Sequence, residues 1–343
     1  MAPTLLLQVG LAPRMTELFL YKSVLVAQRG LLEPEELQNL QKEPELPSDL
    51  TDEEHAQLLA YEAFDYLPDD PDDARAVAGE ALELDEACVD AMLCLWSLER
   101  RESDEALTLA RRAHAVAEAK IERLPHWRRG IDDLWTFQPG CRGFVRAHAA
   151  LAFTLWARGD RYEACGMAER VIALNPTDNT GMRWHLVNWY LIEDATGQAY
   201  RLLRAYPDEQ IGASRWASAL VEFLRSGPGK KARRAFLEAA EHNPGLMMML
   251  TTKTPLSDAN DEVDSFEPGD VTEALVWAGL IREAWAAHPE AMSWARTISE
   301  TPEFADLQVV AMSAILHLLA ENGDRSVDEI LLDVMSAHDP DLL

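Results

Sequence analysis

The sequence feature that most constrains the fold is a set of small residues and prolines that recurs at multiples of about 34 residues. Within the segment 144–176, Ala164 lies on one face of an expected helix and Pro176 ends that helix. A step of 68 residues, twice 34, moves these two positions to Ala232 and Pro244. A plain helical bundle has no reason to keep alanines and prolines in one register. The pattern therefore predicts an array of similar helical units.

Local signals agree with a helical chain. Runs that alternate β-branched and polar residues are scarce, whereas Ala, Leu, Glu and Arg fill segments with a 3.6-residue apolar period. Thr51–Glu54 and Ser326–Glu329 have the spacing of capping boxes, and Asp270 precedes a segment of the same kind. Thr301-Pro302 is expected to start another helix. The expected fold class is all-α.

The segment 144–176 has the pattern typical of a tetratricopeptide repeat: a first helix, a tight turn at Gly159-Asp160, a second helix and a proline. We expect a tetratricopeptide-like α-solenoid of antiparallel helix pairs with N- and C-terminal helical extensions. The expected division is an N-terminal arm and helices over 1–50, a repeat domain over 51–300 interrupted by an insertion at 124–144 and a loop at 251–270, and a C-terminal helical cap over 301–343.

Charge and cysteine content limit the partners. The chain has 31 basic and 59 acidic residues, a net charge of −28, which disfavours direct nucleic-acid binding and anionic membranes and favours solubility or a basic partner. The apolar patch in 1–14 is too short for a signal peptide or a membrane span, so it is expected to be a loose arm or to lie upstream of the natural start. The four cysteines form no CxxC pair, which favours reduced thiols and a cytoplasmic protein.

Known catalytic and metal-binding motifs are missing from the sequence. With Gly181 in the glycine position of a calcium loop, Pro176 and Val187 occupy the two anchoring ligand positions, so the loop fails. Neither HExxH nor a Cys/His group with zinc spacing occurs, and GxSxG, P-loop and GxGxxG patterns are also missing. We therefore expect no catalytic residue, no cofactor and no metal. The run at 175–181 is expected to be a corner between helices, in which Asp178 or Asn179 caps the next helix.

Several stretches resemble tetratricopeptide proteins of the suppressor of tumorigenicity 7 type and their uncharacterised prokaryotic relatives. The family pattern Asn-Pro-x-Asp-Asn-x-Gly-x-Arg is matched in full over 175–183. At 142–147 both arginines and the alanine match, whereas the Pro, Tyr and Met positions differ. Further similarity lies in 80–95, 141–164 and the loop 253–270. The resemblance implies a helical repeat scaffold without a known enzyme activity.

In the family arrangement, the first helix of each repeat lines a concave groove. This arrangement points to candidate partner-binding residues along the groove and in the aromatic insertion: Arg142, Arg146, Asn179, Arg183, Tyr190, Trp127 and Trp135. Arginines that converge there are suited to bind a peptide carboxylate with bidentate hydrogen bonds. In the alternative, each arginine pairs with carboxylates of this chain and pins the insertion.

The expected function is a non-catalytic scaffold or adaptor that binds a protein or peptide, either basic or bearing a free carboxylate. One alternative is a hydrolase or transferase with a site in the insertion, for which His126, Asp132, Asp133 and His148 are the first suspects. Another is an acidic regulator of a basic DNA-associated protein. The sequence leaves the identity of the partner and the oligomeric state open.

Overall fold

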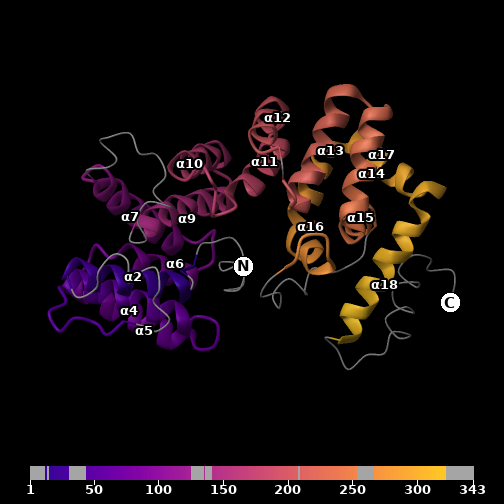
Figure 1. Ribbon diagram of the computed structural model, residues 1–343. Coiled ribbons are helices and arrows are strands. Elements are labelled where there is room, and N and C mark those ends of the chain that lie inside the picture. Colours follow the sequence, from indigo (N-terminus) through magenta and orange to yellow (C-terminus); the bar gives the residue numbers. More distant parts are fainter. Residues whose placement is uncertain are drawn as a thin grey trace. The chain divides into compact units, whose positions relative to one another are not determined.

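A computed structural model describes residues 12–13, 15–30, 44–124, 135, 141–207, 209–252 and 266–321 (Figure 1). Over these residues the chain forms α-helices and a short 3₁₀ helix, with no strand. This confirms the all-α prediction. Within the same ranges, no helix combines the length and apolar character needed to cross a membrane.

The chain divides into two compact units, Met1–Arg183 and Trp184–Leu343. The division falls inside the predicted repeat domain 51–300. Helices of the first unit are α2 (Met15–Gln28), α4 (Asp52–Tyr66), α5 (Pro71–Leu84), α6 (Val89–Ser97), α7 (Asp104–Ile121), α9 (Arg142–Arg158) and α10 (Arg161–Leu174). The second contains most of α11 (Met182–Ile192), then α12 (Thr196–Ala205), α13 (Gly212–Ser226), α14 (Lys230–His242), α15 (Pro244–Thr251), α16 (Val271–Ala286), α17 (Pro289–Ser299), the 3₁₀ helix Pro302–Phe304 and α18 (Ala305–Glu321).

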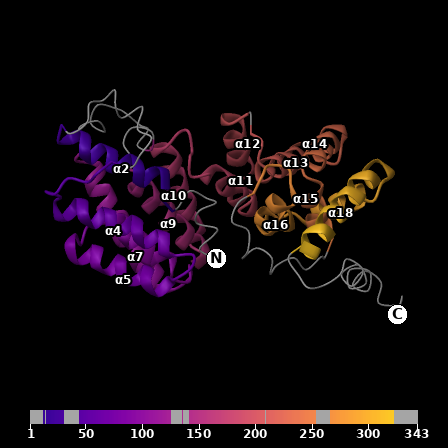
Figure 2. The ribbon, with the colours of Figure 1, turned by 60° about the horizontal axis from the view of Figure 1, so that its bottom comes forward.

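Helices that are neighbours in the sequence pack together in pairs. In the first unit α4 packs on α5, α6 on α7 and α9 on α10, while the first helices of successive pairs also touch, α4 with α6 and α6 with α9. Figure 2 shows α2 on one side of α4 and α5 on the other. In the second unit α13 packs on α14 and α15 on α16, and α15 also packs on α18.

The predicted register of small residues coincides with the helix contacts. Alanine side chains let two helices approach closely, because no atom beyond Cβ separates the backbones. The small residues at the repeated positions of the second helices are completely buried: Ala74, Ala78, Ala106, Ala110, Ala164, Ala168, Ala199 and Ala232. Position 236, which is 68 residues after Ala168, is also completely buried but has a phenylalanine.

Helix ends follow the expected local chemistry at most sites. Thr51 and Glu54 form the predicted capping box, and the Asp270 side chain accepts the backbone N–H of Glu273. Gly159 ends α9 with a left-handed φ of 86°, which a residue without Cβ adopts at little cost. A helical segment does start after Thr301 with Pro302 in its first position, as predicted, but Pro302–Phe304 is a 3₁₀ helix without a side-chain cap and α18 begins at Ala305.

Some predictions concern residues that the structure does not describe. These are the capping box at 326–329, most of the insertion 124–144, most of the loop 251–270 and the arm 1–11.

Candidate functional site

Arg146 of α9 is the centre of a buried ion cluster in the first unit. Its side chain has 0% exposed surface, and its Nη2 lies 2.8 Å from both Glu17 Oε1 and Asp90 Oδ1. Nη1 donates to Glu17 Oε2 at 3.0 Å, so the guanidinium holds that carboxylate with two parallel hydrogen bonds. One side chain of α9 thus ties together α2 and α6.

Helix α4 supplies neutral donors to both carboxylates. Tyr61 donates its hydroxyl to Glu17 Oε1 at 3.3 Å, and Gln57 Nε2 donates to Asp90 Oδ2 at 2.8 Å. Gly143, one turn before Arg146, leaves room for Asp90: a Cβ on that glycine would lie 2.7 Å from Asp90 Oδ2. The close packing of α9 on α6 therefore depends on a glycine at this position.

The charges in this cluster stabilise one another. Burial by itself would lower the pKa of Arg146, but the charges of Asp90 and Glu17 outweigh it and raise that pKa above the ordinary arginine value. Burial and then the same two carboxylates raise the pKa of Tyr61 well above its usual range, so the hydroxyl remains a donor. Arg142 Nη1, 3.6 Å from Glu17 Oε2, adds a second positive charge.

Trp135 brings the insertion to this cluster. Arg142 Nε donates to the Trp135 carbonyl at 3.1 Å, and the guanidinium carbons of Arg142 and Arg146 lie 5.4 and 5.7 Å from the centre of the indole ring. Three predicted groove residues are thus together, as cation–π geometry would favour. Trp127, the other aromatic residue predicted in the insertion, lies outside the described residues.

The arginines meet carboxylates, but these belong to the chain itself. Arg146 has no exposed surface to present to an outside ligand in this conformation, which agrees with the alternative stated from the sequence. Arg146 and Arg183 were expected to converge, yet different carboxylates hold them: Arg183 Nη1 lies 3.0 Å from Asp178 Oδ2. Tyr190 is 8% exposed.

The corner at 175–183 is a helix cap, as predicted. Asp178 Oδ1 accepts the backbone N–H of Met182 at 2.9 Å, and its Oδ2 accepts that of Arg183 at 2.8 Å. Asp178 and Gly181 both have left-handed φ angles, 50° and 68°. Asn179 donates within the corner, to Asn175 Oδ1 at 3.0 Å. Polar groups of this run therefore serve the start of α11.

A cavity of about 310 Å³ lies beside the ion cluster. It is bordered by α2 and by the N-terminal ends of α4, α6 and α9, and this volume is at the lower end of the range for small-ligand pockets. Its lining includes Tyr21, Leu25, Gln57, Cys88, Asp90 and Phe144. The packing of α2 against α4, α6 and α9 thus leaves unfilled space.

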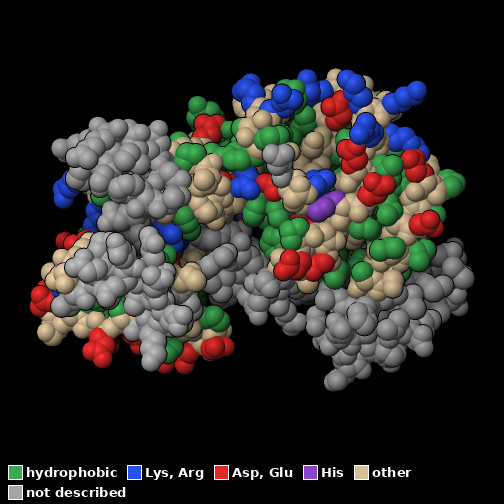
Figure 3. Space-filling model, viewed as in Figure 1, with side chains coloured by type: hydrophobic (Ala, Val, Ile, Leu, Met, Phe, Trp, Pro, Cys, Tyr) green, Lys and Arg blue, Asp and Glu red, His purple; other side chains and the backbone are tan. Residues whose placement is uncertain are grey.

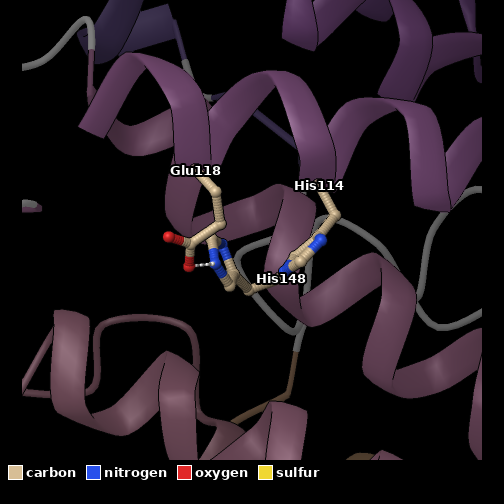
Figure 4. Close-up of side chains that lie close together, drawn as sticks. All are labelled: His114, Glu118 and His148. Atoms are coloured by element: carbon tan, nitrogen blue, oxygen red, sulfur yellow. Dashed lines mark hydrogen bonds and ion pairs between the residues drawn. The ribbon is translucent and has the colours of Figure 1, made fainter. Parts of the chain in front are cut away.

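A second cluster of titratable groups joins α7 and α9 (Figure 4). His148 Nδ1 lies 2.7 Å from the Phe144 carbonyl oxygen, and His148 Nε2 lies 2.7 Å from Glu118 Oε1. The His114 ring packs edge-on against the His148 ring with centroids 4.6 Å apart. Potential ligand atoms of His114, Glu118 and His148 all lie within 4.8 Å of one another.

Burial and neighbouring charges shift the pKa values of His114 and Glu118 in this second cluster. Burial, followed by the charges of His148 and Arg170, lowers the pKa of His114, so its imidazole is neutral near pH 7. Burial alone would raise the pKa of Glu118, but hydrogen bonds and charge from His148 and Arg170 lower it overall. Arg170 of α10 donates to Glu118 Oε1 at 3.2 Å.

Sequence reasoning missed His114 and Glu118. A search for zinc spacing within one segment does not find a group whose third member comes from another helix, 30 residues after Glu118. The available signal was the i, i+4 spacing of His114 and Glu118, which places both on one helix face. Of the enzyme suspects, His148 belongs to this cluster, whereas His126, Asp132 and Asp133 are outside the described residues.

The second unit has a basic edge despite the net charge of −28. Figure 3 shows Lys and Arg side chains gathered over the ends of α12, α13 and α14. Exposed basic residues at helix ends here are Arg204 in the last turn of α12, Arg225 in the last turn of α13, and Lys230 and Lys231 at the start of α14. The negative net charge, from which a basic partner was expected, does not describe this face.

Comparison with known proteins returns no match to a protein-family model, to a curated protein or to a solved structure. The resemblance to the suppressor of tumorigenicity 7 type therefore stays a prediction.

Proposed function

We propose that this protein is a non-catalytic, tetratricopeptide-like scaffold that binds a helical segment bearing a carboxylate. The binding surface is the face of α4, α6 and α9 in the first unit. Support for repeats of this type comes from the pairing of successive helices and from buried alanines that recur at one position of α5, α7, α10, α12 and α14.

The observation that carries the proposal is that helix α2 of the chain itself packs on this face. Glu17 of α2 receives two hydrogen bonds from Arg146 of α9 and one from Tyr61 of α4. The Tyr21 ring packs edge-on against the Tyr61 ring with centroids 5.6 Å apart, and Arg29, just beyond α2, pairs with Glu54 of α4 at 2.7 Å. The face therefore has the donors and the ring contacts with which it would receive a similar segment from a partner.

A helix suits this face because the two residues of α2 that make the main contacts, Glu17 and Tyr21, are one helical turn apart. Glu17 and Tyr21 are four residues apart, so they project from the same side of α2. This is helix-in-groove recognition, in which side chains at i and i+4 anchor an amphipathic helix. The cavity beside Tyr21 and Leu25 leaves space for a larger side chain at those positions in a partner.

Because α2 is tethered, it competes with any partner. A segment held on a short linker has an effective concentration of about millimolar, so a partner in solution must bind more tightly or α2 must first be weakened. The scaffold is thus expected to bind poorly while α2 is seated and well once it is released.

The proposal is tested with a fluorescent peptide of residues 12–30, added to the intact chain and to a Glu17→Gln chain. The Gln side chain keeps the size but loses the charge that Arg146 holds, so the resident α2 is weakened. We expect the peptide to bind the Glu17→Gln chain at least about tenfold more tightly than the intact chain. Fluorescence anisotropy measures both dissociation constants.

The matched control is the same peptide with Glu17→Gln, which is expected to bind at least about tenfold more weakly. A chain that lacks residues 1–43, with its helix content checked by circular dichroism, serves as a third host. Equal binding of the two peptides, or no binding to any of the three hosts, refutes the proposed surface.

A further inference from the structure

The cluster of His114, Glu118 and His148 has a hydrogen-bond problem that suggests a bound ion. The Phe144 carbonyl oxygen can only accept, so His148 Nδ1 must carry a hydrogen and donate to it. His148 Nε2 faces Glu118 Oε1 at 2.7 Å, and a carboxylate oxygen is also an acceptor. A neutral ring would place its Nε2 lone pair against this oxygen. The contact therefore needs a proton, carried by the ring or by the carboxyl group, or a metal cation that binds both atoms and moves them apart.

We propose that His114, Glu118 and His148 bind a divalent transition-metal ion of the zinc class. Two imidazoles and one carboxylate are ligands that such ions prefer in proteins. The His148 ring is already oriented as a ligand, because its Nδ1–H donates to a backbone carbonyl and its Nε2 points into the cluster. The hydrogen bond from Nδ1–H to the Phe144 carbonyl oxygen is the usual outer-shell contact of a metal-binding histidine.

The ligand atoms need small movements to bind an ion. Bond lengths of about 2.0–2.2 Å and tetrahedral angles separate ligand atoms by about 3.3 Å. The Nε2–Oε1 distance of 2.7 Å would open by a fraction of an ångström, and the other separations, which are no greater than 4.8 Å, would close by at most roughly 1.5 Å. His114 is only partly buried, so rotation of its side chain can provide this movement.

The surroundings provide access to the ion and an outer-shell contact. His114 and Glu118 are both partly exposed, which gives an ion a path from solvent to the buried His148. Arg170 Nε and Nη2 each lie 3.2 Å from Glu118 Oε1, and Nη2 also lies 3.5 Å from Oε2, so the guanidinium can orient the carboxylate. Three protein ligands leave a fourth position for water, as in open zinc sites.

The test is titration of the metal-free full chain, without an affinity tag, with Co²⁺ near neutral pH. One equivalent is expected to give the visible absorption of tetrahedral Co²⁺, and Zn²⁺ is expected to abolish it. His114→Ala and Glu118→Gln should each weaken binding at least about tenfold. His55→Ala, which removes an exposed histidine from α4, should bind as the intact chain does.

The protonation of His148 in the intact chain tests the metal site without any variant. Nuclear magnetic resonance of ¹⁵N-labelled histidine should show that saturating Zn²⁺ removes the Nε2–H proton of His148 and leaves the Nδ1–H. If both ring protons persist, or if no saturable Co²⁺ binding occurs, the cluster is an imidazolium–carboxylate pair and the proposal is overturned. Unchanged binding by folded His114→Ala or Glu118→Gln also overturns it.

Discussion

Replacing Arg146 with methionine should cost the first unit a large part of its stability. The variant keeps most of the aliphatic volume, but it leaves Glu17 and Asp90 without the cation that lies 2.8 Å from each. Their side chains are only 3% and 4% exposed, so water cannot replace it. Removing one partner from a buried ion pair typically costs about 3–5 kcal/mol.

The expected loss can be converted into a melting temperature. The first unit spans Met1–Arg183, and domains of about this size lose about 2–4 °C per kcal/mol. Thermal unfolding followed by circular dichroism should therefore shift down by about 6–20 °C. Adding Glu17→Gln and Asp90→Asn to Arg146→Met should recover more than half of the loss, because the buried negative charges are then removed as well.

Arg75→Met is the matched control. Arg75 also pairs with a glutamate, Glu99 at 3.1 Å, but its side chain is 51% exposed and water can replace the lost contact. Such surface pairs contribute about 0–1 kcal/mol. If Arg146→Met melts within error of Arg75→Met, or if the triple variant is less stable than Arg146→Met, the argument from buried charge is refuted.

Three further predictions concern pH, thiol reactivity and helix capping. Burial lowers the pKa of His185 to about 3, whereas the unfolded side chain titrates near 6.5. The contribution of neutral His185 to the free energy of unfolding is therefore fully present above about pH 6.5. Below that pH it falls by about 1.4 kcal/mol per pH unit towards pH 3. Urea unfolding of His185→Phe should show a shallower fall over this range, and an unchanged slope would contradict the assignment. Burial raises the pKa of the Cys88 thiol to about 12 and of the Cys141 thiol to about 11. Iodoacetamide near pH 8 should therefore label the partly exposed Cys165 first, as measured by peptide mass mapping. Labelling of Cys88 at the same rate would contradict this prediction. Asp178→Ala should lower the free energy of unfolding by about 1–2 kcal/mol, because two backbone N–H groups at the start of α11 lose their acceptor, and a loss below about 0.3 kcal/mol would refute the capping role.

Helix positions were predictable because their signals act over a few residues. The Thr51 capping box, the turn at Gly159 and the helix start at Asp270 have the structure expected of them. The candidate sites were predictable only in part. Arg142, Arg146 and Trp135 were identified and do lie together, but their carboxylate partners were not named.

Local sequence signals specify the helices, their caps and the small residues at their crossings. Each of these depends on backbone hydrogen bonds and side-chain volume within one or two turns. The packing of the helices selects which charges meet: Glu17 reaches Arg146 across 129 residues and Asp90 reaches it across 56. The same holds for His148, whose partner Glu118 lies on a different helix. A buried charge takes whichever opposite charge the packing of helices brings within about 3 Å, and no local pattern encodes that choice.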